Sequence, residues 1–255
     1  MLNTLRVDFK RYMMTKVFLI MAVIFSIAGP VFMNISVNLF ADAIKAEKYI
    51  GIDSFWYYSS NASIYLAVII TMFLNAEAGE GIIRNKLISG KKRYQVLISY
   101  CLVNTVVATI LELLSVISAA VVGVLSGAVL RVSVDEIIRY TLVATLAGIA
   151  IGILYTAVYI CFCTKKIANV IPIAIAMLVK IAMIVISDAL FTTSGVPKVT
   201  GTTLKIYTGI DRYFAFFHLN NELRYDNMSY IIGNAALIII SILVGSLVFT
   251  KKDFQ

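Results

Sequence analysis

The sequence predicts an all-α integral membrane protein with six transmembrane helices, and two observations carry this prediction. Of the 255 residues, 60% are hydrophobic and only 14% are charged, whereas soluble domains carry roughly 25% charged residues. Six apolar runs are also long enough to cross a bilayer, which takes about 20 residues of helix. A water-soluble fold could not bury so much apolar surface behind so few charges. Residues 1–255 are therefore expected to form a single transmembrane domain.

The first apolar run follows basic residues, as a signal peptide does. It continues well past the usual length of a signal-peptide core, and no small-residue cleavage site follows it, so we expect a retained helix. The six predicted spans are Val17–Phe40, Tyr58–Ala78, Val96–Leu125, Ile138–Phe162, Ala168–Leu190 and Ser229–Thr250.

The positive charge is placed at the ends of the apolar runs. A net charge of +8 could indicate a nucleic-acid binder, but these basic residues form no soluble face, so no nucleic-acid partner is expected. Short loops rich in Lys and Arg stay on the cytoplasmic side of a membrane. The bias predicts a multi-pass membrane protein with both termini cytoplasmic. Its predicted inner cations include Arg6, Lys10, Arg11, Lys16, Arg84, Lys86, Lys91, Lys92, Arg93, Lys165, Lys166, Lys251 and Lys252.

Residues 1–15 have the pattern of a basic amphipathic helix. Apolar side chains recur at helical spacing on one face, with Arg6, Lys10 and Arg11 on the other. Such a helix is typical of the inner membrane interface; the alternative is an unstructured N-terminal tail. The apolar face consists of Leu2, Leu5, Phe9, Tyr12 and Met13.

The outer segment Phe191–Asn227 is rich in aromatic residues but too short in apolar runs to span. Because lipid satisfies no backbone hydrogen bonds, such a segment should be helical or covered by protein. We expect two short re-entrant helices joined by a turn near Gly209, which would cover the outer end of a path through the bundle. The candidate outer-gate residues are Tyr207, Tyr213, Phe214 and Phe217.

Two ionisable residues fall at membrane depth, where charge is costly and indicates function. Glu112 lies in the third predicted span and Lys180 in the fifth, at comparable depth. Three interpretations are open: an ion pair that clamps two helices, a polar lining of a transport path, or no pairing at all. Gly123-x-x-x-Gly127 and Gly148-x-x-x-Gly152 predict close helix packing.

The motifs of common catalytic sites are missing from the sequence. It contains no GxxxxGK[ST] phosphate-binding loop, no HExxH and no GxSxG, and its only histidine is His218. We therefore expect no enzyme activity, no catalytic residues, no metal site and no cofactor bound by this chain.

The inner loop between the second and third spans is the most informative stretch. Glu77 and Glu80 end one span, a short helix Ile82–Ile88 follows, and Gly90 precedes the cations Lys91-Lys92-Arg93. A solvated connector would not need four large aliphatic residues in so short a helix. The pattern favours a compact element that docks to a soluble partner.

The segment Glu80–Arg93 reads EGIIRNKLISGKKR and resembles the loop E-x-G-T-I-R-N-K-L-I-S-G-K-x-R of membrane subunits of type-2 ATP-binding-cassette (ABC) exporters. It departs from that pattern in having the glutamate next to the glycine and isoleucine in place of threonine. The segments Thr164–Ala168 and Leu247–Asp253 resemble the corresponding inner ends of helices in the same family.

This resemblance implies that the loop is a coupling helix seated on a separate ATPase subunit, which binds ATP and Mg. Two ATPase copies would serve two membrane subunits, this chain pairing with a second copy of itself or with a similar permease. The N-terminal helix would be the connecting helix beside the loop. The implied coupling residues are Glu80, Arg84, Asn85, Lys86, Leu87, Ile88, Lys91 and Arg93.

The substrate is less well defined by the sequence. Chains of this length resemble exporters of lantibiotics, bacitracin and phenol-soluble modulins, so a hydrophobic or amphipathic peptide is the expected cargo. The apolar spans, with few charges and no large outer domain, agree with that cargo. Alternatives are a sodium ion, a drug or a lipid-linked glycan, and, from other classes, a membrane-embedded enzyme or an ATP-independent carrier.

Overall fold

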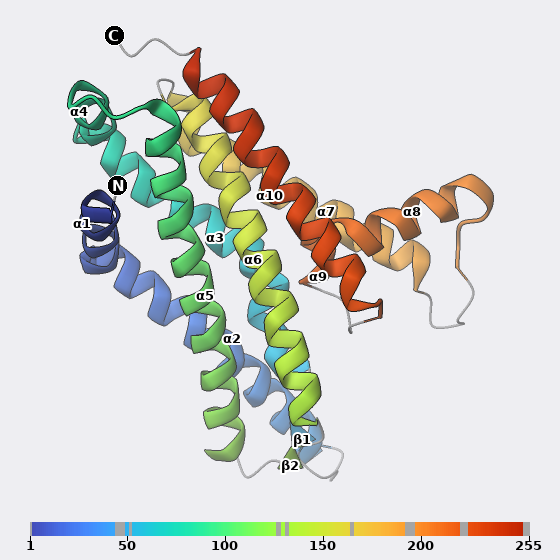
Figure 1. Ribbon diagram of the computed structural model, residues 1–255. Coiled ribbons are helices and arrows are strands. Elements are labelled where there is room, and N and C mark those ends of the chain that lie inside the picture. The colour runs from blue at the N-terminus through green and yellow to red at the C-terminus, as the bar shows by residue number, and fades with distance from the viewer. Residues whose placement is uncertain are drawn as a thin grey trace.

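The computed structural model describes residues 2–43, 49–50, 53–125, 129–130, 133–163, 166–191, 197–219 and 224–251. Nearly all of them are helical (Figure 1). The helices are α1 (Leu2–Met14), α2 (Lys16–Ala43), α3 (Asp53–Gly79), α4 (Ile82–Ile88), α5 (Arg93–Leu125), α6 (Val134–Phe162), the 3₁₀ turn η1 (Lys166–Asn169), α7 (Ile171–Leu190), α8 (Gly201–Tyr213), α9 (Ala215–His218) and α10 (Asn227–Thr250). Two-residue strands β1 (Tyr49–Ile50) and β2 (Val129–Leu130) pair in parallel.

Five described helices are long and apolar enough to cross a membrane: α3, α5, α6, α7 with η1, and α10. A sixth span arises only if Leu5–Met14 and Phe18–Phe32, which meet at a bend of 65°, are taken as one broken span. The all-α membrane architecture is therefore supported, and the count of six spans stays a prediction.

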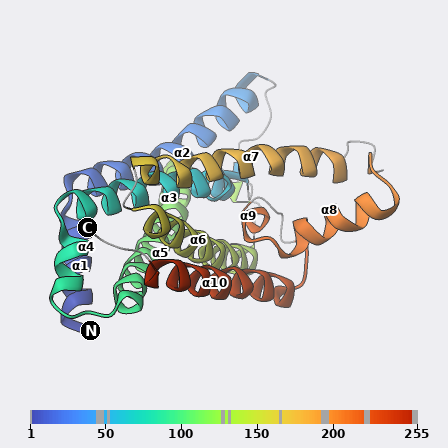
Figure 2. The same cartoon turned by 90° about the horizontal axis from the view of Figure 1, so that it is seen from above.

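Helix α6 forms the centre of the bundle, where it packs against α3, α5 and α10 (Figure 2). Its Gly148 and Gly152 have no side chain, so Leu66 and Ile70 of α3 lie within van der Waals range of where a Cβ would be. The predicted close approach at these two glycines is confirmed. The other glycine pair expected to favour packing, Gly123 and Gly127, lies partly outside the described residues.

Helix α10 approaches α6 through a further glycine, Gly245. A Cβ at this position would lie 2.9 Å from the Cβ of Ala157, closer than real side chains approach. The absent side chain is thus what permits the contact between these two helices.

Helices α7 and α8 project from the bundle as an arm (Figures 1 and 2). Exposed apolar side chains such as Leu178 and Ile181 cover much of α7. Helix α4 lies at the same end of the molecule as α1 and the last turn of α10, and the β1–β2 pair lies at the other end (Figure 1).

The N-terminal helix packs against neighbouring helices of the chain. Tyr12 is fully buried, and Leu5, Phe9 and Met13 pack against the core. The predicted helix is present, and its place at the inner membrane interface stays a prediction. Its amphipathic pattern matches the neighbouring helices, which offer an apolar surface inside the molecule.

Candidate functional site

Helix α4 stands between α3 and α5 at the bounds that the sequence predicted, Ile82–Ile88. Two glycines allow so short a helix, because Gly81 and Gly90 have φ angles of +70° and +85°, a conformation that glycine adopts without steric cost. The N–H of Asn85 donates to the carbonyl of Gly81, and the N–H of Ser89 donates to the carbonyl of Asn85.

The side chains of α4 divide between an inner and an outer face. Ile83 and Lys86 are buried, and Leu87 packs partly against the core. Arg84 and Asn85 are exposed, and Ile88 exposes 73% of its surface. A large aliphatic side chain in water at the tip of a molecule is suited to burial by a partner.

The buried Lys86 is the centre of an ion network that joins four helices. Its ammonium nitrogen lies 2.8 Å from Oδ1 of Asp8 on α1 and 3.5 Å from Oε2 of Glu77 on α3. It also donates to the hydroxyl of Tyr100 on α5 at 2.9 Å, and that hydroxyl donates to Glu77 Oε2 at 2.8 Å. Asp8 and Glu77 are 1% and 2% exposed, so the network is almost dry.

Further contacts satisfy the remaining carboxylate oxygens. Ser99 Oγ donates to Oδ2 of Asp8 at 2.8 Å. Arg11 donates to Oε2 of Glu80 at 2.9 Å and lies 3.5 Å from Oε1 of Glu77. Two cations thus face the two buried carboxylates, which is the arrangement that makes burial of charge tolerable.

The family resemblance implies that Lys86 and Arg93 are coupling residues, and in the structure both contact other helices of this chain. Lys86 is turned inward to the network. Arg93 donates from Nη1 to the carbonyls of Phe249 and Thr250, at 3.0 Å each, at the end of α10. Among the implied coupling residues, Glu80 bonds to Arg11 and Lys91 is half-buried. The exposed face of α4 is left to Arg84, Asn85 and Ile88.

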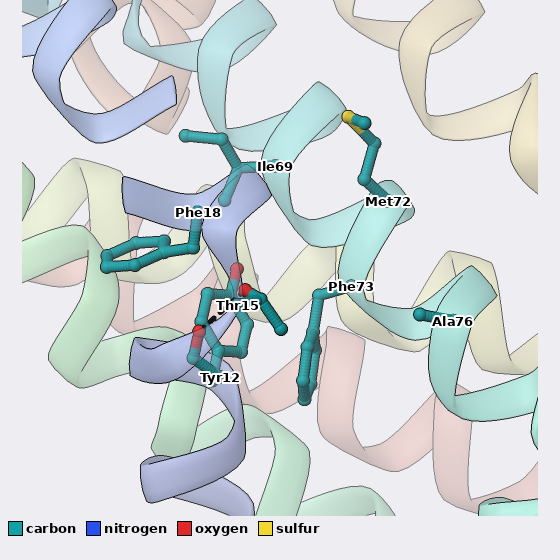
Figure 3. Close-up of a pocket in the computed structure, with 7 residues that line it drawn as sticks. All are labelled: Tyr12, Thr15, Phe18, Ile69, Met72, Phe73 and Ala76. Carbon is teal, nitrogen blue, oxygen red and sulfur yellow. Dashed lines mark hydrogen bonds between the residues drawn. The ribbon is translucent and has the colours of Figure 1, made fainter. Parts of the chain in front are cut away.

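An aromatic cluster lies at the bend between α1 and α2 (Figure 3). The ring centroids of Tyr12 and Phe73 are 3.9 Å apart, and those of Tyr12 and Phe18 are 5.2 Å apart. Met72 and Thr15 line a cavity of about 90 Å³ beside them. These contacts fix α1 on α3 next to the ion network.

Asp8, Ser99 and Tyr100 were not recognised from the sequence. A signal for Asp8 was present: it falls on the apolar face of α1, between Leu5 and Tyr12, where a solvated carboxylate would not be expected. Ser99 and Tyr100 follow the ordinary pattern of a span, and nothing in the sequence alone distinguishes them.

Glu112 and Lys180 do not pair. Glu112 on α5 accepts a hydrogen bond from Ser59 Oγ at 2.6 Å, whereas the Lys180 ammonium on α7 donates to the carbonyl oxygen of Ser60. The two residues contact neighbouring positions of α3, so the expected clamp between the third and fifth spans is replaced by two separate links to α3.

The outer segment folds back beside α10. Its two short helices were predicted, but they meet at Phe214, whose backbone is extended, and Gly209 lies inside α8. Helix α8 continues past Gly209 because a single glycine weakens a helix without ending it. Phe214 stacks on Phe216 at 5.1 Å, and Phe216 meets Tyr155 of α6 at 6.2 Å.

The imidazole of His218 links α9 to α8 and α10. Its Nδ1 lies 3.1 Å from the Asn234 amide nitrogen on α10, and its Nε2 lies 3.0 Å from the carbonyl oxygen of Arg212. These partners suit the neutral tautomer with the proton on Nε2. Burial lowers the pKa of His218 from its ordinary value. Asn234 is seven residues into α10, so His218 lies about 10 Å along that helix.

Contacts of charged side chains join α8 to the residues that precede and begin α10. Arg212 is 2.7 Å from Oδ1 of Asp226, and Tyr225 donates to Asp211 at 2.6 Å. Hydrogen bonds from Ser229 and then from Arg212 lower the pKa of Asp226 to about 2.

Of the four candidate gate residues, Phe214 and Phe217 lie together, with their ring centroids 6.4 Å apart. Phe217 is buried and Phe214 is half-buried at the junction of α8 and α9. Tyr207 is half-buried on α8, and Tyr213 is 45% exposed beside Arg212. A role of these four residues in an outer gate stays a prediction.

In the described part of the chain, no three His, Cys, Asp or Glu side chains lie close enough to hold a metal ion. Comparison with known protein families found no matching family model, and comparison with curated proteins found no significant match.

Proposed function

We propose that this chain is the membrane subunit of a type-2 ABC exporter of a bacterial cytoplasmic membrane, and that α4 is its docking site for a separate ATPase subunit. The observation that carries the proposal is the construction of α4. It is a short helix between two spans, anchored inward by Lys86, that presents Arg84, Asn85 and Ile88 outward.

The anchoring matters because a docking element must transmit displacement. Lys86 joins α4 to α1, α3 and α5, so movement imposed on α4 reaches three helices together. Two ATPase copies, which bind ATP and Mg, would act on a pair of membrane subunits. The resemblance of Glu80–Arg93 to the coupling loop of such exporters supports the same role.

The proposed cargo is a hydrophobic or amphipathic peptide. A groove of about 480 Å³ between α2 and α5 is lined by apolar side chains, with Ser26 and Ser118 the polar exceptions among its lining residues. Such a surface suits an apolar cargo better than a hydrated ion. Transport of a labelled amphipathic peptide into vesicles holding both subunits would test this, with sodium transport as the contrary result.

The docking proposal is tested by replacing Ile88 with aspartate in the chain co-expressed with an ABC ATPase subunit encoded beside it. We expect the I88D variant to insert normally but to lose most of the co-purified ATPase, because the charge replaces an apolar contact. Ile206→Asp is the matched control, since Ile206 of α8 is also exposed, at 53%, and lies outside the candidate spans. Equal retention of ATPase by both variants and the wild type would contradict docking through α4.

A further inference from the structure

A buried carboxyl group lies within the bundle away from the docking site. Glu112 is 3% exposed, near the middle of the 33-residue helix α5. Ser59 of α3 donates to its Oε1 at 2.6 Å. Tyr140 of α6 is fully buried and interacts electrostatically with Glu112. Three helices therefore meet at one carboxyl group.

No cation neutralises this carboxyl group within the described part of the chain. The ammonium group of Lys180 is held by the carbonyl oxygen of Ser60, and the ion pairs found join other residues. An isolated carboxylate at this depth is very costly, because neither lipid nor apolar side chains replace its hydration.

We propose that Glu112, Ser59 and Tyr140 form an intramembrane proton-binding site, in which Glu112 takes up one proton from water and becomes a neutral carboxylic acid. The oxygens of Ser59 and Glu112 are 2.6 Å apart, which fits a single shared proton and leaves no room for a metal ion between them. Ser59 and the acid keep a hydrogen bond in the neutral form, because a hydroxyl and a carboxylic acid each donate and accept.

Proton occupancy then controls how α3 packs on α5 and α6. Loss of the proton puts a negative charge between the three helices, and water or a counter-ion must enter to stabilise it. On the neighbouring helices, Tyr140 of α6 interacts with Glu112, and Lys180 of α7 binds the carbonyl oxygen of Ser60, next to Ser59. The proposal does not depend on the exporter function and is tested on the chain alone.

The experiment compares the purified wild type with Glu112→Gln by infrared spectroscopy in H₂O and D₂O across neutral and alkaline pH. We expect the wild type to show a protonated-carboxyl band that shifts in D₂O and disappears when the pH is raised, and Glu112→Gln to lack it. Measured from about pH 5 upward, the unfolding temperature of the wild type should fall relative to that of Glu112→Gln and level off where the band disappears, because above the ordinary glutamate pKa of about 4.3 only the folded chain keeps this proton. Glu136→Gln is the matched control, since Glu136 is exposed and glutamine can replace it in its capping box.

Two results would overturn the site. One is the absence of a protonated-carboxyl band from the wild type at neutral pH, a measurement that needs no variant to fold. The other is a gain in wild-type stability from sodium chloride, absent with the chloride of a larger cation and absent in Glu112→Gln, which would mean that the carboxylate holds a metal ion.

Discussion

At the residue scale, Lys86 shows how one buried cation can organise several helices. Its ammonium group contacts Asp8, Glu77 and Tyr100, which belong to three different helices. It also lies over the Tyr100 ring at 4.1 Å. Because the partners are nearly dry, each contact is less screened than at a surface.

Replacement of Lys86 by methionine should therefore destabilise the protein strongly. It leaves two carboxylates buried near each other, and loss of one partner of a buried pair typically costs about 3–5 kcal/mol. Asp8→Asn in the same chain should recover part of the loss, with a coupling of about 0.5–3 kcal/mol. Thermal unfolding of the four variants of the cycle measures this, and strictly additive losses would mean that Asp8 and Lys86 do not interact.

A second residue-scale prediction concerns His218. Burial lowers its pKa in the folded chain, while the unfolded chain has the ordinary value of about 6.5. Above that pH the histidine side chain is neutral in both the folded and the unfolded chain. Below it the unfolded chain binds a proton that the folded chain excludes, so stability should fall as the pH falls. Asp226 contributes in a separate window: its contribution is lost only as the pH falls toward 2.

Unfolding temperatures of the wild type and of His218→Gln between pH 8 and about 5 provide the measurement. As the pH decreases below about 6.5, the unfolding temperature of the wild type should fall relative to that of the variant. If the unfolding temperature changed equally with pH in both proteins, groups other than His218 would be responsible for the change.

At the element scale, contact between the outer segment and α10 depends on a glycine. A Cβ at Gly233 would overlap the carbonyl oxygen of Tyr213 and come within 3.1 Å of the His218 ring. The junction of α8 and α9 can thus approach α10 only where the side chain is absent.

Gly233→Ala should displace this junction, whereas Gly209→Ala should not. A Cβ at Gly209 meets nothing within 4 Å, and alanine is better in a helix than glycine by about 1 kcal/mol. A single cysteine at Phe217, which is 1% exposed, reports the change through a membrane-impermeant thiol reagent. We expect labelling only with Gly233→Ala; labelling of the Phe217 cysteine in the parent chain would show that the segment is not packed there.

At the scale of the whole molecule, burial is uneven. The most apolar stretch of α6 is 72% buried, whereas those of α7 and α10 are 17% and 22% buried. Lipid can cover such faces, and so can a second subunit. The proposed exporter needs a second subunit, because a path for a peptide is expected between two membrane subunits.

We therefore expect the complex with its ATPase to contain two membrane chains and two ATPase chains. Native mass spectrometry of the detergent-purified complex, with differently tagged copies of this chain co-expressed, distinguishes a homodimer from a pairing with another permease. Recovery of a single membrane chain with the ATPase would contradict the proposed assembly.

The sequence by itself determined the features that depend on local pattern. Apolar runs predicted the long helices, and the glycines around Ile82–Ile88 predicted a short helix with the observed bounds. Two short helices were also expected in the outer segment. These features follow from hydrophobic periodicity and backbone preference, which act over a few residues.

The tertiary structure alone decided which charges face inward and what they bind. Ser99 and Asp8 are 91 residues apart, and Arg93 meets the carbonyl of Phe249 across 156 residues. Glu112 was recognised as a costly buried charge, yet its partner is Ser59 and not Lys180. Periodicity shows that a side chain lies on an inner face, but the choice of partner depends on how distant helices pack, because a hydrogen bond requires its two atoms to be within about 3 Å of each other.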